Sequence, residues 1–138
     1  MPLFDASSVQ AALRKLRGDA VPILKGQTVL DLTLYELGNV VWKENRASGG
    51  DPREAAERVK TIVRLLSIME IRRIDPGEMP AIAENASRHS LTFYDSAYLT
   101  AALTSATYLV TEDTDILRAA QEAGLTASPM DQYMKTFD

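Results

Sequence analysis

The segment from Leu91 to Ala120 constrains the fold of this chain more than any other part of the sequence. Its hydrophobic pattern predicts a helix, a short apolar strand over Tyr108 to Thr111 and then a second helix. Asp95 lies in the first turn of the first helix, and Asp113 lies where the strand passes into the second. Carboxylates at such places either cap helices or bind a metal ion. The number of comparable acids elsewhere in the chain decides between the two.

The rest of the sequence repeats this alternation of short apolar strands with helices. Further strands are predicted at residues 1–5, 27–30 and 70–74, with a brief edge strand at 125–127. Further helices are predicted at residues 9–17, with a cap from Ser7 or Ser8, and at 33–45, 52–67 and 78–87. Strands that alternate with helices form a parallel sheet covered by helices on both faces. We therefore expect residues 1–138 to form one α/β domain, a three-layer sandwich around a parallel sheet of about five strands.

Two further acids occupy places like those of Asp95 and Asp113. Asp5 ends the first strand, and Glu36 lies in the first turn of the helix after the second strand. In an open α/β sheet, ligands bind beyond the carboxyl ends of the strands. If these ends converge, four carboxylates meet in one crevice and repel one another unless a cation neutralises them. Ligands that are all oxygen select a hard ion such as Mg²⁺ or Mn²⁺.

Each of these acids also has a purely structural explanation. Residues 33–36 and 92–95 both begin with threonine and end with an acid, as a capping box requires. Asp113 is suited to cap a helix that begins at Thr114, where the helix dipole favours negative charge. The residues alone leave both explanations open.

The composition excludes other kinds of chemistry. There is no cysteine, so a disulfide framework, a thiolate nucleophile and a zinc site of the cysteine type are all absent. The one histidine, His89, lies in a polar connection where we expect a surface loop. The net charge of −4 argues against a protein that coats nucleic acid, although a local basic rim remains compatible with it. No secretory signal and no apolar run of about 18 residues is visible, so we expect a cytoplasmic protein.

Four short motifs resemble those of PIN domains, in particular the small prokaryotic toxin ribonucleases of the VapC type. They occur in the family's order and are Leu3-Phe4-Asp5-Ala6-Ser7, Leu34-Tyr35-Glu36-Leu37-Gly38-Asn39, Leu91-Thr92-Phe93-Tyr94-Asp95-Ser96-Ala97-Tyr98 and Leu109-Val110-Thr111-Glu112-Asp113. By this resemblance the catalytic, metal-binding acids are Asp5, Glu36, Asp95 and Asp113. Ser7 and Thr111 match hydroxyl positions that orient a carboxylate or a water. Asp115 is an extra acid that can be confused with Asp113, and Asp31 is a weaker rival of Glu36.

The resemblance implies a Mg²⁺- or Mn²⁺-dependent endoribonuclease that hydrolyses RNA and is the toxin of a toxin–antitoxin pair. A carboxylate-held ion lowers the pKa of bound water and neutralises the charge that develops at phosphorus. We expect Asp5 and Asp95 to be the principal ligands. Its implied partners are RNA, a cognate antitoxin and further copies of the chain in a homodimer or higher oligomer. Candidates to contact substrate phosphates are Arg14, Lys15, Arg17, Lys43 and Arg46.

Other readings of the same residues remain open. A PIN-like fold can serve as a non-catalytic RNA- or protein-binding module, although the presence of all four acids argues against it. A haloacid-dehalogenase-like phosphatase requires a second aspartate at the position of Ser7. A receiver domain requires a lysine after the last strand, and no convincing one follows Ala127. The helical hairpin over residues 33–67 carries more apolar residues than one sheet face needs, which favours a dimer or an antitoxin groove. We expect Tyr98 in the core and Trp42 in the core or an interface.

Overall fold

A computed structural model describes residues 1–137, so Asp138, the last residue of the predicted domain, lies outside the described residues. The sheet has the strand order β3-β2-β1-β4-β5, and every neighbouring pair is parallel. Its strands are β1 (Leu3–Phe4), β2 (Thr28–Leu30), β3 (Glu70–Arg72), β4 (Leu109–Val110) and β5 (Ala127–Ser128). The predicted α/β fold with a parallel sheet of five strands is therefore confirmed.

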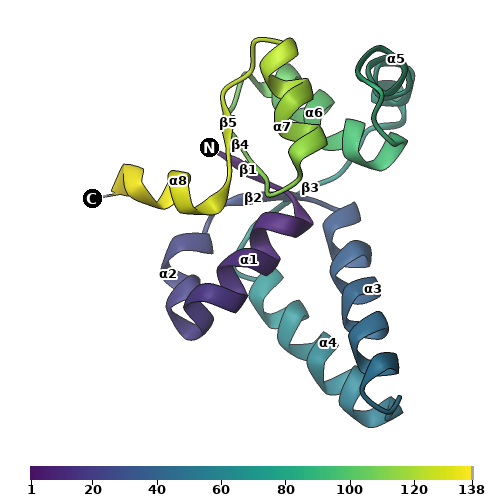
Figure 1. Cartoon of the computed structure of the whole chain (residues 1–138), viewed down its shortest axis with the longest axis vertical. Coiled ribbons are helices and arrows are strands. Elements are labelled where there is room, and N and C mark those ends of the chain that lie inside the picture. Colours follow the sequence, from purple (N-terminus) through teal and green to yellow (C-terminus); the bar gives the residue numbers. More distant parts are fainter. Residues whose placement is uncertain (138) are drawn as a thin grey trace.

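Helices cover both faces of this sheet. Figure 1 shows α1 (Ala6–Leu16), α2 (Ala20–Leu24), α3 (Leu32–Ala47) and α4 (Pro52–Leu66) on one side. On the other side lie α5 (Met79–His89), α6 (Phe93–Ser105) and α7 (Thr114–Glu122). The short helix α8 (Met130–Met134) follows β5. Short 3₁₀ turns η1 (Arg17–Asp19), η2 (Pro76–Glu78) and η3 (Lys135–Phe137) complete the elements. None of these helices is both long and apolar enough to cross a membrane.

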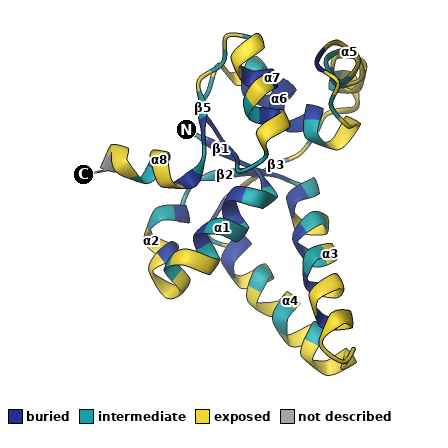
Figure 2. Cartoon of the chain, viewed as in Figure 1, coloured by how far each residue is buried: buried dark blue, intermediate teal, exposed yellow. Residues whose placement is uncertain are grey.

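The alternation of side chains along the strands explains why both faces are covered. Phe4 and Val110 belong to the core under α1 and α4, whereas their neighbours Leu3 and Leu109 belong to the core under α6. Because successive strand residues point to opposite faces, apolar residues at both positions bury both faces. Figure 2 shows buried residues gathered around the sheet and exposed residues at the far end of the α3–α4 hairpin.

Several local predictions were wrong. Residues 20–24 form the helix α2, which was not predicted; Pro22 is compatible with it because a proline in the first helical turn removes no helical hydrogen bond. The first helix begins at Ala6 rather than Val9, and Asp5 is its cap in place of Ser7 or Ser8. Trp42 is 52% exposed, with the Arg46 guanidinium 5.5 Å from its ring centroid, so the core alternative is wrong and the interface alternative stays a prediction.

The predicted surface position of His89 was also wrong. His89 is buried at the end of α5, and its Nδ1 lies 2.9 Å from Glu122 Oε1 on α7. Arg118, also on α7, donates a hydrogen bond to the His89 carbonyl. These partners come from a helix about thirty residues further along the chain, which the local polarity of the sequence does not reveal.

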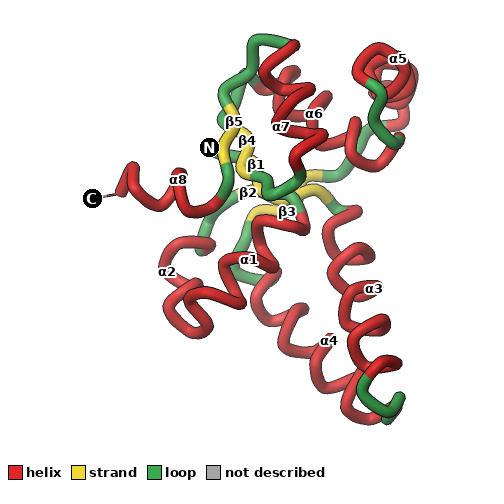
Figure 3. Tube along the Cα trace, in the orientation of Figure 1, coloured by secondary structure: helices red, strands yellow, loops and turns green. Residues whose placement is uncertain are grey.

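The loops that follow β1, β2 and β4 lead directly into α1, α3 and α7 (Figure 3). The strands are parallel, so these loops leave the sheet at the same edge. The chain moves outward from β1 to β2 and β3, and then returns to the other side of β1 for β4 and β5. The sheet therefore has its topological switch point between β1 and β4, where ligands of such folds bind.

Candidate active site

Asp5 lies at this switch point, directly after β1. It is almost fully buried, and its Oδ1 accepts hydrogen bonds from Ser7 Oγ at 2.7 Å and from the Ser8 amide at 2.9 Å. Its Oδ2 accepts a hydrogen bond from Thr111 Oγ1. Burial raises the pKa of Asp5, and the hydrogen bonds from Thr111, Ser8 and Ser7 oppose that rise only in part.

Ser7 and Thr111 also bind the loop that leads to α7. Ser7 Oγ accepts a hydrogen bond from the Glu112 amide at 2.9 Å, and Thr111 Oγ1 accepts one from the Asp113 amide at 3.0 Å. Each hydroxyl therefore donates to Asp5 and accepts from the backbone beside Asp113. The pair joins the end of β1 to the end of β4 and holds the Asp5 carboxylate in one orientation.

Asp113 caps α7, as the structural explanation required. Its Oδ1 accepts hydrogen bonds from the amides of Asp115 and Ile116, at 2.8 and 3.2 Å. Asp115 is exposed, and its carboxylate lies 4.0 Å from the Arg118 guanidinium one turn further along the helix. These two hydrogen bonds fix Oδ1 of Asp113. Asp113 follows β4 and Asp5 follows β1, so both carboxylates lie at the same edge of the parallel sheet.

The capping explanation of Glu36 was wrong. The cap of α3 is Asp31, whose carboxylate accepts a hydrogen bond from the Leu32 amide at 2.9 Å. Thr33 is fully buried, and Glu36 Oε1 accepts a hydrogen bond from the Tyr98 hydroxyl of α6 at 2.5 Å. Burial raises the pKa of Glu36, the Tyr98 hydrogen bond opposes this, and repulsion from Asp5 and Asp95 adds to it.

The helix that carries Asp95 has its predicted threonine cap. Thr92 Oγ1 accepts a hydrogen bond from the Asp95 amide at 3.1 Å, which leaves the Asp95 carboxylate outside that bond. Burial raises the pKa of Asp95, and repulsion from Asp113 and Asp115 raises it further. The next residues of this helix, Ser96 to Ala102, are all buried, so the backbone of Asp95 adjoins a well-packed segment.

Mutual repulsion connects all of the predicted acids. Glu36 is repelled by Asp5 and Asp95, and Asp95 is repelled by Asp113 and Asp115. This repulsion supports the expected convergence of the acids at one edge of the sheet, which stays a prediction. Within residues 1–137, however, no three acids already form a group that surrounds an ion.

The residues present suit a hard cation in their chemistry. Every candidate donor is a carboxylate or hydroxyl oxygen, which is the preference of Mg²⁺ and Mn²⁺. Burial is the largest cause of the raised pKa values of Asp5, Glu36 and Asp95, and repulsion between acids raises the pKa values of Glu36 and Asp95 further. Binding of a divalent ion would relieve this repulsion, so the donor set fits such an ion.

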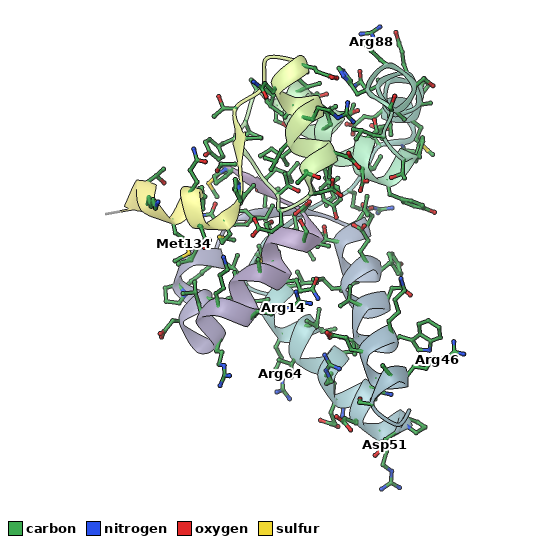
Figure 4. The ribbon with its side chains drawn as sticks, viewed as in Figure 1. Arg14, Arg46, Asp51, Arg64, Arg88 and Met134 are labelled. Carbon is green, nitrogen blue, oxygen red and sulfur yellow. The ribbon has the colours of Figure 1, made fainter. Side chains whose placement is uncertain are left out.

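The ion-pair partners described for the predicted basic residues lie outside the set of four acids. Arg14 points from α1 toward the α3–α4 hairpin (Figure 4), and its guanidinium lies 3.9 Å from Glu44. Lys15 forms an ion pair with Asp131 at 2.6 Å. Arg46 lies toward the far end of the hairpin, away from the loops that carry the acids (Figure 4). Arg17 and Lys43 are exposed, without an ion pair among the described residues.

Sequence reasoning missed the part that Tyr98 plays. The prediction that Tyr98 is a core residue is correct, since it is 1% exposed, yet its hydroxyl reaches Glu36. Tyr94, the residue before Asp95, is exposed. The only signal for Tyr98 was its position three residues after Asp95, which places both on one face of a helix.

Taken together, the fold and the acids define a parallel α/β domain with a carboxylate-lined edge. The family model of the PIN domain matches residues 3–122 of this chain. Exonuclease VapC9 of Pyrobaculum aerophilum is 34% identical over 95 residues, which cover 69% of this chain and 68% of that protein. The chain belongs to the PIN-domain family.

Two solved structures share this fold. The crystal structure of PAE2754 from Pyrobaculum aerophilum has a TM-score of 0.77 and 29% sequence identity, and the match covers 98% of this chain and 87% of that one. A toxin–antitoxin complex from Klebsiella pneumoniae contains a chain with a TM-score of 0.58 and 17% identity, covering 83% and 88% of the two chains. At that identity, the second likeness concerns the fold alone.

Proposed function

We propose that this protein is a metal-dependent endoribonuclease and the toxin of a toxin–antitoxin pair. The observation that carries the proposal is that Glu36 lies close enough to Asp5 and Asp95, and Asp95 close enough to Asp113, for these acids to repel one another beside the switch point of the sheet. The name of one relative, Exonuclease VapC9, supports nuclease activity of the VapC type.

The site residues have distinct parts in this proposal. Asp5 and Asp95 are the principal ligands of Mg²⁺ or Mn²⁺, and Glu36 and Asp113 bind directly or through water. When bound, the ion activates a water and neutralises charge on the scissile phosphate. Ser7 and Thr111 keep Asp5 in place through the hydrogen bonds described above. One of the carboxylates accepts the proton of the attacking water.

RNA cleavage with and without Mn²⁺ tests this proposal directly. Asp95→Asn keeps the size of the side chain and removes its charge, so we expect about a 100-fold loss of cleavage or more. Asp115→Asn is the matched control, because Asp115 is an exposed acid close to the site whose neighbour is Arg118. Cleavage that persists in EDTA, or an unimpaired Asp95→Asn variant, would refute the mechanism. Binding of RNA without any cleavage would favour the non-catalytic module instead.

Exonuclease activity is the second candidate, favoured by the name of the relative from Pyrobaculum aerophilum. A circular RNA has no ends, so an endonuclease linearises it and an exonuclease leaves it intact. We expect this chain to linearise the circle in Mn²⁺ and expect Asp95→Asn to leave it closed. Degradation of linear RNA only, with an intact circle, would assign the exonuclease activity.

An antitoxin is the partner that we propose for the apolar groove between α1 and the α3–α4 hairpin. The groove has a volume of about 270 Å³ and an apolar floor that includes Leu13, Leu37 and Ile62. At its rim, Glu44 pairs with Arg58 at 2.6 Å and lies 3.9 Å from Arg14.

We also propose a cytoplasmic homodimer or higher oligomer. Light scattering of the purified chain, alone and with the product of an adjacent reading frame, tests both forms of association.

A further inference from the structure

Two buried hydroxyls connect the helix that carries Glu36 with the helix that carries Asp95. Tyr98 lies on α6, about one turn after Asp95, and Thr33 lies at the start of α3. The Tyr98 hydroxyl is 2.5 Å from Glu36 Oε1 and 2.6 Å from Thr33 Oγ1. The three side chains form a continuous hydrogen-bonded chain in which the two hydroxyl residues are fully buried.

The protons of this chain have a defined direction. A phenol has a single proton, and an ionised carboxylate has none to donate. Tyr98 therefore donates to Glu36, and Thr33 donates to Tyr98. Hydrogen bonds in such a series polarise one another, so the bond that ends on Glu36 is strengthened by the bond before it.

We propose that Tyr98, itself oriented by Thr33, is a positioning residue that anchors Glu36 Oε1 and leaves Oε2 for the bound cation. The proposal rests on the function proposed above. A glutamate side chain has several rotatable bonds, and anchoring one oxygen removes most of their freedom before any ion binds. Because Tyr98 and Asp95 share one rigid helix, the same contact fixes the Glu36 carboxylate relative to Asp95.

Other buried hydroxyls of α6 serve packing, and they show what a purely structural hydroxyl looks like here. Thr100 Oγ1 accepts a hydrogen bond from Asn85 Nδ2 of α5 at 3.0 Å. Ser96 Oγ donates to the Ile82 carbonyl at 2.7 Å. Tyr108, just before β4, is half-buried against the core on the other face of the sheet, and its hydroxyl donates to the Ser128 hydroxyl of β5. Thr100→Val and Tyr108→Phe are thus matched controls for Thr33→Val and Tyr98→Phe.

Mn²⁺ binding to the full chain without RNA, measured by isothermal titration calorimetry, tests the proposal. We expect Tyr98→Phe to weaken Mn²⁺ binding about tenfold and Thr33→Val to weaken it by a smaller factor. The Mn²⁺ concentration that half-saturates RNA cleavage should rise by the same factors, with a smaller change in kcat at saturating Mn²⁺. The controls should lower the midpoint of thermal unfolding and leave Mn²⁺ affinity unchanged.

A double-substitution cycle separates positioning from general destabilisation. In a Glu36→Ala background, Tyr98→Phe should cause no further loss of Mn²⁺ affinity, because the carboxylate through which it acts is gone. A further loss there, or an equal loss in the two controls, would overturn the proposal. So would wild-type affinity in Tyr98→Phe.

Two remaining outcomes also decide the matter. If Tyr98→Phe does not fold, Thr33→Val carries the same test while keeping the phenol, and full affinity in that variant would overturn the proposal. A wild-type chain that neither binds Mn²⁺ nor cleaves RNA would refute the proposed function and this inference together. A wild-type chain that does both, beside an unaffected Tyr98→Phe, would refute the inference alone.

Discussion

Substitutions of Asp113 can separate the structural effect of its carboxylate, which caps α7, from the effect of its charge on metal binding. Its Oδ1 accepts the amides of Asp115 and Ile116, and its charge adds to the repulsion on Asp95. Asp113→Ala removes the cap and the charge together, whereas Asp113→Asn removes the charge alone, because asparagine caps helices about as well as aspartate. The two variants should therefore differ in stability and agree in metal binding.

The expected size of the stability effect follows from the cap. Loss of an N-cap side chain costs about 1 kcal/mol, within a range of roughly 0.5–2 kcal/mol. For a chain of 138 residues, an unfolding entropy of about 2.1 cal/mol/K per residue converts 1 kcal/mol into a shift of about 3–4 °C. In Asp113→Asn, the weaker interaction with the helix dipole is offset by relief of repulsion with Asp95, so we expect a change below about 0.5 kcal/mol.

Thermal unfolding followed by circular dichroism in EDTA measures this effect without any bound ion. Asp113→Ala should unfold about 3–4 °C below the wild type, and Asp113→Asn within about 2 °C of it. Both should bind Mn²⁺ more weakly than the wild type in calorimetry. Equal melting temperatures for the two variants would refute the cap argument, and unchanged Mn²⁺ binding in Asp113→Asn would remove this residue from the metal site.

Three further predictions concern the same edge of the sheet. An acid whose folded pKa is raised disfavours the folded state at neutral pH, and this cost disappears as the pH falls through the folded pKa. Since Asp5, Glu36 and Asp95 all have raised pKa values, the melting temperature in EDTA should rise as the pH falls from 7 toward the ordinary pKa range of carboxyl groups. The rise should be smaller in Asp95→Asn, and a fall in both proteins would contradict this. Thr111→Val removes a donor to buried Asp5 and an acceptor of the Asp113 amide, so it should cost about 1–3 kcal/mol in urea unfolding. Mn²⁺ at about 100 times its dissociation constant should stabilise the wild type by about 2.7 kcal/mol, reversibly with EDTA; no stabilisation would mean no specific site.

Local patterns were sufficient for much of the fold. The apolar strands around Phe4, Val29 and Val110 and the helices between them predicted the parallel sheet, because burial on both faces requires runs of apolar residues at these positions. The same patterns missed α2 and α8, which are five residues long and show no helical period of useful length. The strand predicted at residues 125–127 is shifted to Ala127–Ser128, where pairing with β4 rather than local preference decides the register.

Some residues of the candidate site were likewise predictable from local patterns, and the surroundings of Glu36 were not. Asp5, Asp95 and Asp113 were each predicted from position at the end of a strand or the start of a helix, a property of a few neighbouring residues. For Glu36, the local pattern suggested a cap, and the structure assigns that cap to Asp31 instead. Glu36 turns toward Tyr98, which lies 62 residues further along the chain. No local pattern contains such a contact, since it depends on how α3 packs beside α6.

The sequence by itself determined the alternation of strands and helices, the absence of cysteine chemistry and the set of acids with a place at strand or helix ends. These are properties of composition and short-range spacing. Only the tertiary structure decided which acids share one electrostatic neighbourhood, which hydroxyls hold them and that His89 is buried. The physical reason is that hydrogen bonds, desolvation and charge repulsion depend on distance in space. The folded sheet brings residues such as Asp5 and Thr111 together across more than one hundred positions of the chain.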